Sequence, residues 1–225
     1  MSNLSNQEAV YVENNQPLIT VNDRKTYLIA KRLLDIIGSL LGIILLSFLF
    51  IIIAILIKIE DPKGSVFFTQ KRVGLNGKEF KMYKFRSMVS DAEVKLAQLL
   101  KYNEVSGAMF KMKDDPRITK IGKFIRKTSI DELPQLFNVL KGEMSLVGPR
   151  PPLTREVALY SEYDRQRLMV TPGCTGLWQV SGRNSLGFEE MVELDLKYIR
   201  NRSVLLEIKI ILKTVVLLLG SKNAF

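Results

Sequence analysis

Residues 126–142 read RKTSIDELPQLFNVLKG, and this stretch decides the expected fold around the site as well as its expected chemistry. The neighbouring carboxylates Asp131 and Glu132 stand where a helix is predicted to begin, with Arg126 and Lys127 upstream and an apolar helical face downstream. A carboxylate at a helix N-terminus stays ionised, and the same place attracts phosphate and metal ions. The stretch therefore predicts an anionic group held ready beside basic residues.

The two carboxylates permit a structural and a chemical interpretation. Ser129-x-x-Glu132 matches a capping box, and Asp131 is suited to be an N-cap with Pro134 in the first turn. Spacing alone favours this cap at least as well as any chemistry. In the chemical hypothesis one carboxylate attacks phosphorus, forming an acyl phosphate, while the other holds Mg²⁺ through oxygen. The nearby basic residues able to bind a diphosphate are Arg117, Arg126 and Lys127.

Composition narrows the chemistry. The chain has 225 residues, 47% of them hydrophobic, which is enough for one domain with a core plus a membrane element. It contains no histidine, which excludes Ser-His-Asp and Cys-His catalysis and histidine-ligated zinc. The one cysteine, Cys174, excludes an intramolecular disulfide and is interpreted as structural. The formal charge of +10 fits nucleic acid, anionic lipid or a phosphorylated substrate.

The N-terminal part predicts a tail followed by a membrane-associated helix. The run Leu33–Ile57 is almost entirely apolar and, at about 1.5 Å per residue, long enough to cross a hydrocarbon core of roughly 30 Å. Basic residues flank both ends, which favours a helix that enters one leaflet, bends near Gly42 or Ser47 and returns. A straight span and a buried core helix are the alternatives. The expected organisation is a disordered polar tail (1–24), a membrane-associated helix (25–60) and a cytoplasmic catalytic domain (61–225).

The remainder predicts an α+β fold that is mainly helical. A small β-hairpin is expected from 66–73 and 79–85 around Asn76-Gly77, a pair that favours positive φ. Aromatic residues interleaved with basic residues, as in the second strand, can also indicate RNA binding. A half-buried strand with a solvated face gives this pattern more often. The last helix is expected to be amphipathic and interfacial, with a core helix nearly as probable. The predicted helices span 90–102, 119–127, 187–201 and 205–219.

Two glycine- and proline-rich segments are expected to be loops that present basic side chains. Residues 145–152 form a proline-braced loop in which Arg150 can meet an anion at little ordering cost, although a solvated surface turn explains it as well. Residues 172–184 contain Trp178, whose ring can stack on a base, and glycines whose backbone can approach a phosphate. The segment lacks P-loop spacing.

Six separated motifs, taken together and in this order, resemble the bacterial sugar transferases, specifically the monotopic phosphoglycosyl transferases. The similarity covers roughly residue 31 to the C-terminus, and each motif alone is weak. The motifs are Lys31-Arg32-x-x-Asp35, Tyr83-Lys84-Phe85-Arg86-Ser87-Met88, Asp115-Pro116-Arg117, residues 129–139, Val147-Gly148-Pro149-Arg150-Pro151 and residues 176–184.

The resemblance implies transfer of a sugar 1-phosphate from a UDP-sugar to undecaprenyl phosphate with release of UMP, at the cytoplasmic face of the bacterial membrane. It implies that Asp131 is the nucleophile of a covalent phospho-sugar intermediate and that Glu132 is the Mg²⁺ ligand. The residues that it places at phosphate or nucleotide are Arg126, Arg150 and Arg183, with Lys84 and Arg86 in addition. One departure concerns the membrane helix: the family commonly has Ser-Pro at its bend, and here Ser47-Phe48 stands there.

Two competing functions predict different products. A membrane-attached glycosyltransferase that moves the sugar without phosphate would use Asp131 as a general base and release UDP. A basic anchor for lipid or nucleic acid would keep its function in Asp131→Asn. We expect UDP-sugar, undecaprenyl phosphate and membrane lipids as partners, and no nucleic acid. The sugar, the glycan pathway and the oligomeric state, including a homo-oligomer, are left open by the sequence.

Overall fold

The long apolar run forms two helices. The computed structural model describes residues 11–12, 16–17, 19–21, 23–99, 112, 114–182 and 186–220. Helix α1 spans Lys25–Leu45 and α2 spans Ser47–Glu60, with a bend of 60° between them. None of the described helices is long and apolar enough to cross a membrane alone, whereas this bent pair passes the same test jointly. The break at Leu46 confirms the bend expected near Ser47, although no proline enforces it.

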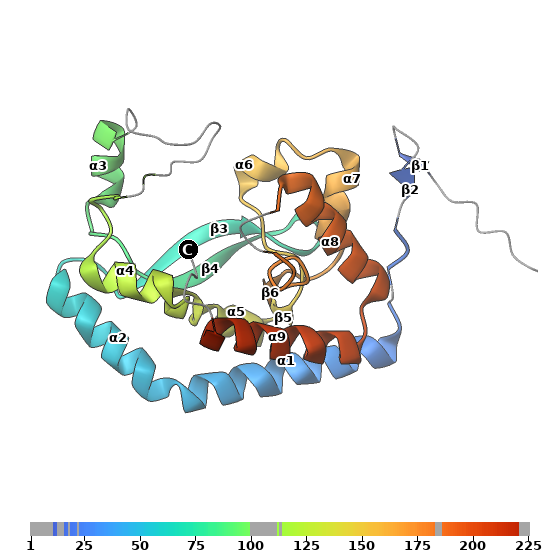
Figure 1. Ribbon diagram of the computed structural model, residues 1–225, viewed down its shortest axis with the longest axis horizontal. Coiled ribbons are helices and arrows are strands. Elements are labelled where there is room, and N and C mark those ends of the chain that lie inside the picture. The colour runs from blue at the N-terminus through green and yellow to red at the C-terminus, as the bar shows by residue number, and fades with distance from the viewer. Residues whose placement is uncertain are drawn as a thin grey trace, which may run out of the picture.

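Both arms of the bent pair are docked on the same body (Figure 1). Near the start of α1, the Arg32 guanidinium donates hydrogen bonds to the carbonyls of Val139 and Leu140 in α5 (Gln135–Lys141) at 2.6 and 2.7 Å. At the end of α2, the Glu60 carboxylate accepts bonds from the first two backbone N–H groups of α4 (Lys120–Lys127) at 2.6 and 2.9 Å. The bend therefore returns the chain to the domain from which it departs.

The predicted hairpin is confirmed. Strands β3 (Phe67–Val73) and β4 (Glu79–Phe85) pair antiparallel from Phe67 opposite Phe85 to Val73 opposite Glu79. The single-turn helix η1 (Leu75–Gly77) connects them, and Asn76 and Gly77 both have positive φ, of 54° and 77°. The Asn-Gly pair supplies this conformation at low steric cost, which is why the turn was predictable.

The other helices follow their predicted positions closely. Helix α4 is capped by Thr119, whose Oγ1 accepts a bond from Gly122 N at 2.9 Å. Of the helix predicted at 90–102, the described part is α3 (Ala92–Leu99), and residues 100–102 lie outside the described residues. Helices α8 (Phe188–Asn201) and α9 (Val204–Gly220) also match. The remaining short elements are β1 (Tyr11–Val12), β2 (Gln16–Pro17), η3 (Ile130–Glu132), α6 (Thr154–Val157), α7 (Glu162–Arg165) and η4 (Gln166–Met169).

The two segments expected to be loops contain a pair of strands, which corrects that prediction. Strands β5 (Ser145–Val147) and β6 (Gly173–Thr175) run parallel, with Ser145 opposite Gly173 and Val147 opposite Thr175. A Cβ on Gly173 would lie 2.0 Å from Gly148 N, so close backbone approach requires glycine there. The pairing brings the Arg150 loop and the 176–182 segment together.

A buried polar cluster fixes α1 against the C-terminal helices. Lys31 Nζ lies 2.6 Å from Glu207 Oε2 and donates to the Val147 carbonyl at 2.8 Å. The hydroxyls of Tyr27 and Tyr198 donate to Glu207 Oε1 at 2.7 and 2.6 Å. Around it lies the main core cluster, which comprises Ile19, Val147, Val170, Val192, Leu196, Tyr198, Ile199 and Ile210. The inner side of α9 thus belongs to the core, while its outer side exposes apolar residues.

Candidate functional site

The two carboxylates precede α5 and do not cap it, which corrects the capping-box interpretation. Asp131 and Glu132 lie in the single turn η3, and α5 begins later, with Pro134 at its N-cap position. Ser129 has a left-handed backbone, φ 57°, and its side chain makes no capping bond. The left-handed residue redirects the chain between α4 and η3, so the turn orients both carboxylates toward the hairpin.

Asp131 is an ionisable group in a buried place. The residue is 7% exposed, and its Oδ1 has no hydrogen-bond partner among the described residues. Burial is the largest influence on the pKa of Asp131, which is raised to about 6. The positive charges of Lys84 and Arg126 act to lower this pKa, and the negative charge of Glu132 acts to raise it. At neutral pH the carboxylate is therefore still mostly ionised, with one oxygen lacking the stabilisation that water would give.

Lys84 of β4 joins the two carboxylates. Its Nζ lies 2.6 Å from Glu132 Oε1 and 3.9 Å from Asp131 Oδ2. The tight contact is therefore with Glu132, and the more distant one influences Asp131 mainly through charge. The hairpin register places Lys84 opposite Phe68, and this places the ammonium group over η3.

A polar cavity of about 480 Å³ opens beside Asp131. Four of the predicted substrate-binding residues line it together with Asp131, namely Lys84, Arg86, Arg117 and Arg126. Arg117 is held by Asp115 through bonds of 2.7 to 3.2 Å, and Arg86 donates to the Asp61 carbonyl at 2.7 Å. A Cβ on Gly64 would lie 1.0 Å from Arg86 Nη1, so glycine makes room for this guanidinium. The cavity is thus basic and suited to anionic oxygens.

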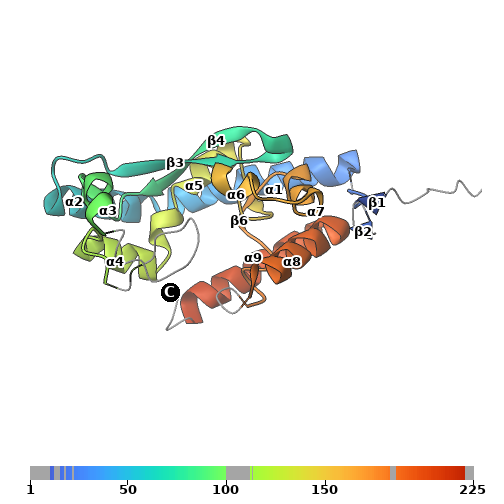
Figure 2. The same ribbon diagram turned by 90° about the horizontal axis from the view of Figure 1, so that it is seen from above.

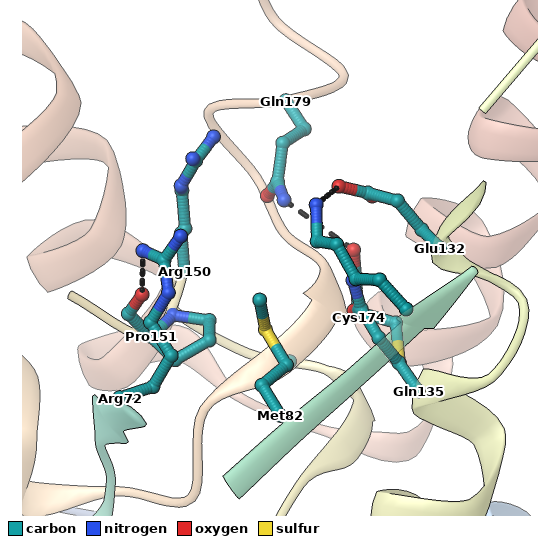
Figure 3. Close-up of a pocket in the computed structure, with 10 residues that line it drawn as sticks. Arg72, Met82, Glu132, Gln135, Arg150, Pro151, Cys174 and Gln179 are labelled. Atoms are coloured by element: carbon teal, nitrogen blue, oxygen red, sulfur yellow. Dashed lines mark hydrogen bonds and ion pairs between the residues drawn. The ribbon is translucent and has the colours of Figure 1, made fainter. Parts of the chain in front are cut away.

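A second, narrow pocket of about 30 Å³ lies beside Glu132 (Figure 3). Arg72 and Arg150 stand on one side of it, and Glu132 on the other, with Gln179 above. Arg150, a predicted substrate-binding residue, is therefore separated from the group around Asp131, and among the described residues Lys84 alone lines both spaces. Arg183, the remaining predicted residue, lies outside the described residues.

Arg72 is a site residue that sequence reasoning missed. It is 5% exposed and donates to the Pro151 carbonyl at 3.0 Å and to Gln70 Oε1 at 2.7 Å. Burial, followed by the nearby Arg150, lowers the pKa of Arg72 to about 10. The feature of the sequence that could have indicated Arg72 is its position next to Val73 at the end of a strand. A solvated lysine or glutamate is more usual at such a position. Trp178, in contrast, is buried and lines neither polar pocket.

The donor set fits a magnesium ion only together with a phosphate ligand. Among the described residues, no group of three or more carboxylate, thiol or imidazole side chains is arranged around a common point. Mg²⁺ is commonly held by one or two carboxylates plus substrate phosphate oxygens, and Asp131 and Glu132 are such a pair. Asp131, whose Oδ1 has no partner among the described residues, and the partly exposed Glu132 are the carboxylates that would hold it.

Comparison with known proteins identifies the family of this chain. The sequence model of the family described as "Bacterial sugar transferase" matches residues 26–221. The chain is 54% identical over 200 residues to galactosyl transferase CpsE of Streptococcus agalactiae, covering 87% of this chain and 44% of that protein. It is 45% identical over 199 residues to undecaprenyl-phosphate galactose phosphotransferase of Salmonella typhimurium, covering 87% and 41%.

A further relative is similar in length. Exopolysaccharide production protein ExoY of Sinorhizobium fredii is 40% identical over 201 residues, covering 88% of each chain. The chain thus spans less than half the length of the first two relatives and most of the third. Because the family match extends over almost all of the described fold, from α1 to α9, this chain belongs to the bacterial sugar transferase family.

Proposed function

We propose that this protein transfers a sugar 1-phosphate from a UDP-sugar to undecaprenyl phosphate and releases UMP, as the first membrane step of exopolysaccharide or capsule synthesis. The observation that carries the proposal is Asp131. A buried carboxylate with an unpartnered oxygen faces a basic cavity, beside a lysine that touches both acidic residues. The names of the relatives above supply the lipid carrier and the phosphotransfer.

In the first step Asp131 acts as the nucleophile. One carboxylate oxygen forms a bond to the phosphorus that carries the sugar, and the bond from that phosphorus to the bridging oxygen breaks. UMP leaves with the bridging oxygen, and an aspartyl phospho-sugar remains. Arg126, Arg117 and Arg86 line the cavity in which the phosphates would lie, where their charges offset the negative charge that accumulates on the leaving group.

In the second step an oxygen of undecaprenyl phosphate attacks the same phosphorus. The acyl phosphate bond breaks, Asp131 regains its carboxylate, and the product is an undecaprenyl diphosphate sugar. Lys84 lies between Asp131 and the pocket of Arg72 and Arg150, so it is suited to bind phosphate oxygens in both steps. Two successive transfers let one carboxylate serve a water-soluble donor and then a lipid acceptor.

Glu132 would hold Mg²⁺, with Asp131 and the donor phosphates as further oxygen ligands. The ion, when bound, supplies positive charge that neutralises the diphosphate. Lys84 already neutralises Glu132 at 2.6 Å, so binding of the ion and of the ammonium group would compete for this carboxylate.

We also propose that the α1–α2 pair enters one leaflet of the cytoplasmic membrane and returns, which keeps the catalytic body on the cytoplasmic face. The support is the docking of both arms on that body through Arg32 and Glu60. A straight crossing would have to break one of these attachments. The outward residues of both helices are apolar and exposed, as a lipid environment favours.

The nucleotide product distinguishes this function from its rivals. The purified protein is incubated with undecaprenyl phosphate, Mg²⁺ and each of a panel of UDP-sugars, and the released nucleotide is identified. We expect UMP with at least one donor, and none with Asp131→Asn. Release of UDP would instead support a glycosyltransferase, and unchanged function in Asp131→Asn would support a binding protein.

A further inference from the structure

An apolar groove runs from Glu132 between α1 and α9. It has a volume of about 360 Å³. The α1 side is formed by Leu34 and Gly38, the α9 side by Ile211, Val215 and Leu218, and Leu136 of α5 forms part of the base. The two helices lie close together at their N-terminal ends and diverge toward the C-terminus of α9, as the two views show (Figures 1 and 2). The groove occupies the space between these diverging helices.

One end of the groove is polar and belongs to the site. Glu132, Gln179 and Cys174 line the groove and also line the narrow pocket of Lys84, Arg72 and Arg150. The groove and the phosphate-binding side of the site are therefore adjoining spaces that share a wall. A ligand that fills both the groove and the narrow pocket would have an apolar chain and an anionic head group.

The other surroundings of the groove are apolar and exposed. Next to its lining residues on α9, Leu212 is 60% exposed. On α1, Leu41 and Ile44 are 53% and 64% exposed. A hydrocarbon chain leaving the groove would therefore stay in contact with apolar side chains instead of entering water.

Small residues on α1 keep the groove open. A Cβ on Gly38 would lie 2.6 Å from Leu146 Cδ1, and one on Gly42 would lie 3.0 Å from Leu136 Cδ1. Both leucines line the groove, so larger residues on this face of α1 would push them into it. The Gly-x-x-x-Gly spacing thus has a role separate from the bend, because the break falls later, at Leu46.

We propose that this groove binds the isoprene units of undecaprenyl phosphate nearest to its phosphate, and that the phosphate lies toward Lys84 and Arg150. The inference rests on the proposed function and adds to it the binding site of the lipid acceptor. The groove leads one chain to one anion-binding site, which fits a phosphate that carries a single chain. The UDP-sugar enters the separate polar cavity on the other side of Asp131.

The test separates the two half-reactions. Release of UMP from a UDP-sugar without acceptor measures the first, and transfer from the preformed intermediate to undecaprenyl phosphate measures the second. In Val215→Trp we expect a KM for undecaprenyl phosphate raised about tenfold or more, with the UMP burst within about twofold of wild type. The matched control is Val216→Trp, an adjacent α9 position that does not line the groove, and it should leave both half-reactions unchanged.

An unchanged KM in Val215→Trp with an intact UMP burst would overturn the groove assignment. Equal effects of the two substitutions would overturn it as well. Failure of the proposed function looks different, because the wild-type protein would then give no UMP burst with any donor. The burst itself reports that the variant is folded.

A second measurement avoids the bulky substitution. Val215→Cys and Val216→Cys are labelled with a maleimide, with the wild-type chain, which has Cys174 alone, as background. Undecaprenyl phosphate should slow labelling at position 215 and not at 216, and phospholipid without a polyprenyl chain should slow neither. Equal protection by phospholipid would show that the groove holds a membrane lipid and would overturn the proposal.

Discussion

Asp131 is ionised at neutral pH at a cost to stability. Its pKa in the folded protein is raised by burial from 3.8 to about 6, so folding favours the protonated form between these values. Above pH 6 the carboxylate is ionised in both the folded and unfolded states, and the full penalty is present. Below pH 4 it is protonated in both, and the penalty disappears. The carboxylate proposed as the nucleophile therefore lowers the stability of the fold at neutral pH.

Asp131→Asn should consequently raise the free energy of unfolding while abolishing UMP release. We expect a gain of up to about 3 kcal/mol at pH 7, decreasing between pH 6 and pH 4, measured by denaturant unfolding across this range. Asp91→Asn, at an exposed position in an i,i+4 ion pair, is the control and should change stability by less than about 0.5 kcal/mol. A destabilised Asp131→Asn at pH 7 would contradict this account.

Burial raises the pKa of Asp131 and Lys84 lowers it, so both should influence the pH range in which Asp131 acts. The rate of the UMP burst should fall on the acid side as pH drops through about 6, because protonation removes the nucleophile. Lys84 lowers the pKa of Asp131, so in Lys84→Met the acid limb should move to higher pH, in addition to any loss of rate. Lys81→Met, an exposed position on the same strand, should leave the limb in place. An unshifted limb in Lys84→Met would argue against this role.

At the residue level, the residues that line the candidate site could largely be predicted because they lie in separate motifs whose order is specific. Asp131, Glu132, Lys84, Arg86, Arg117, Arg126 and Arg150 are all brought to the two polar spaces. The pattern could not separate them into two groups, since that depends on the hairpin lying across η3. Arg72 could not be predicted as a site residue because a basic residue in a strand normally indicates a solvated face.

At the element level, the Lys31–Glu207 pair fixes α1 to α9 and so determines the width of the proposed lipid groove. Both side chains are buried, 9% and 0% exposed, and lie 2.6 Å apart. Removing one partner leaves an uncompensated buried charge, and Lys31→Met should lower the free energy of unfolding by about 3–5 kcal/mol.

Neutralising both partners should restore much of that loss. In denaturant unfolding, Lys31→Met/Glu207→Gln should lose much less stability than the sum of the losses of the two single variants. The reason is that neither member of the pair is left as an unpaired charge. The exposed pair Lys71–Glu79 at 3.3 Å is the matched comparison, with an expected coupling below about 1 kcal/mol. Additive effects at the buried pair would contradict the inferred coupling.

Elements with a strong local signal were predicted, and those that depend on tertiary pairing were not. The hairpin followed from Asn76-Gly77 and α4 from Thr119 and the residues after it. Strands β5 and β6 have three residues each and lie in glycine- and proline-rich segments, so only their mutual contact defines them. The capping box failed because Ser129 has a left-handed backbone, which spacing does not reveal.

At the level of the whole molecule, the docking of α1 and α2 predicts that both ends of the pair face the cytoplasm. Thr20 and Lys63 are exposed positions before α1 and after α2. In Thr20→Cys and Lys63→Cys, a membrane-impermeant maleimide should not label the introduced cysteine in intact cells. It should label the cysteine of both variants after permeabilisation. The wild-type chain reports the background from Cys174. Labelling of either position in intact cells would refute the re-entrant arrangement.

The central claim is that Asp131 carries the phospho-sugar, and intact-protein and peptide mass measurement tests it most directly. The protein is incubated with each UDP-sugar and Mg²⁺ in the absence of lipid acceptor. The account predicts, for at least one donor, an added mass equal to one sugar phosphate on the peptide containing Asp131, lost on addition of undecaprenyl phosphate and absent in Asp131→Asn. Steady turnover to UMP with no added mass on Asp131 at any time would contradict it.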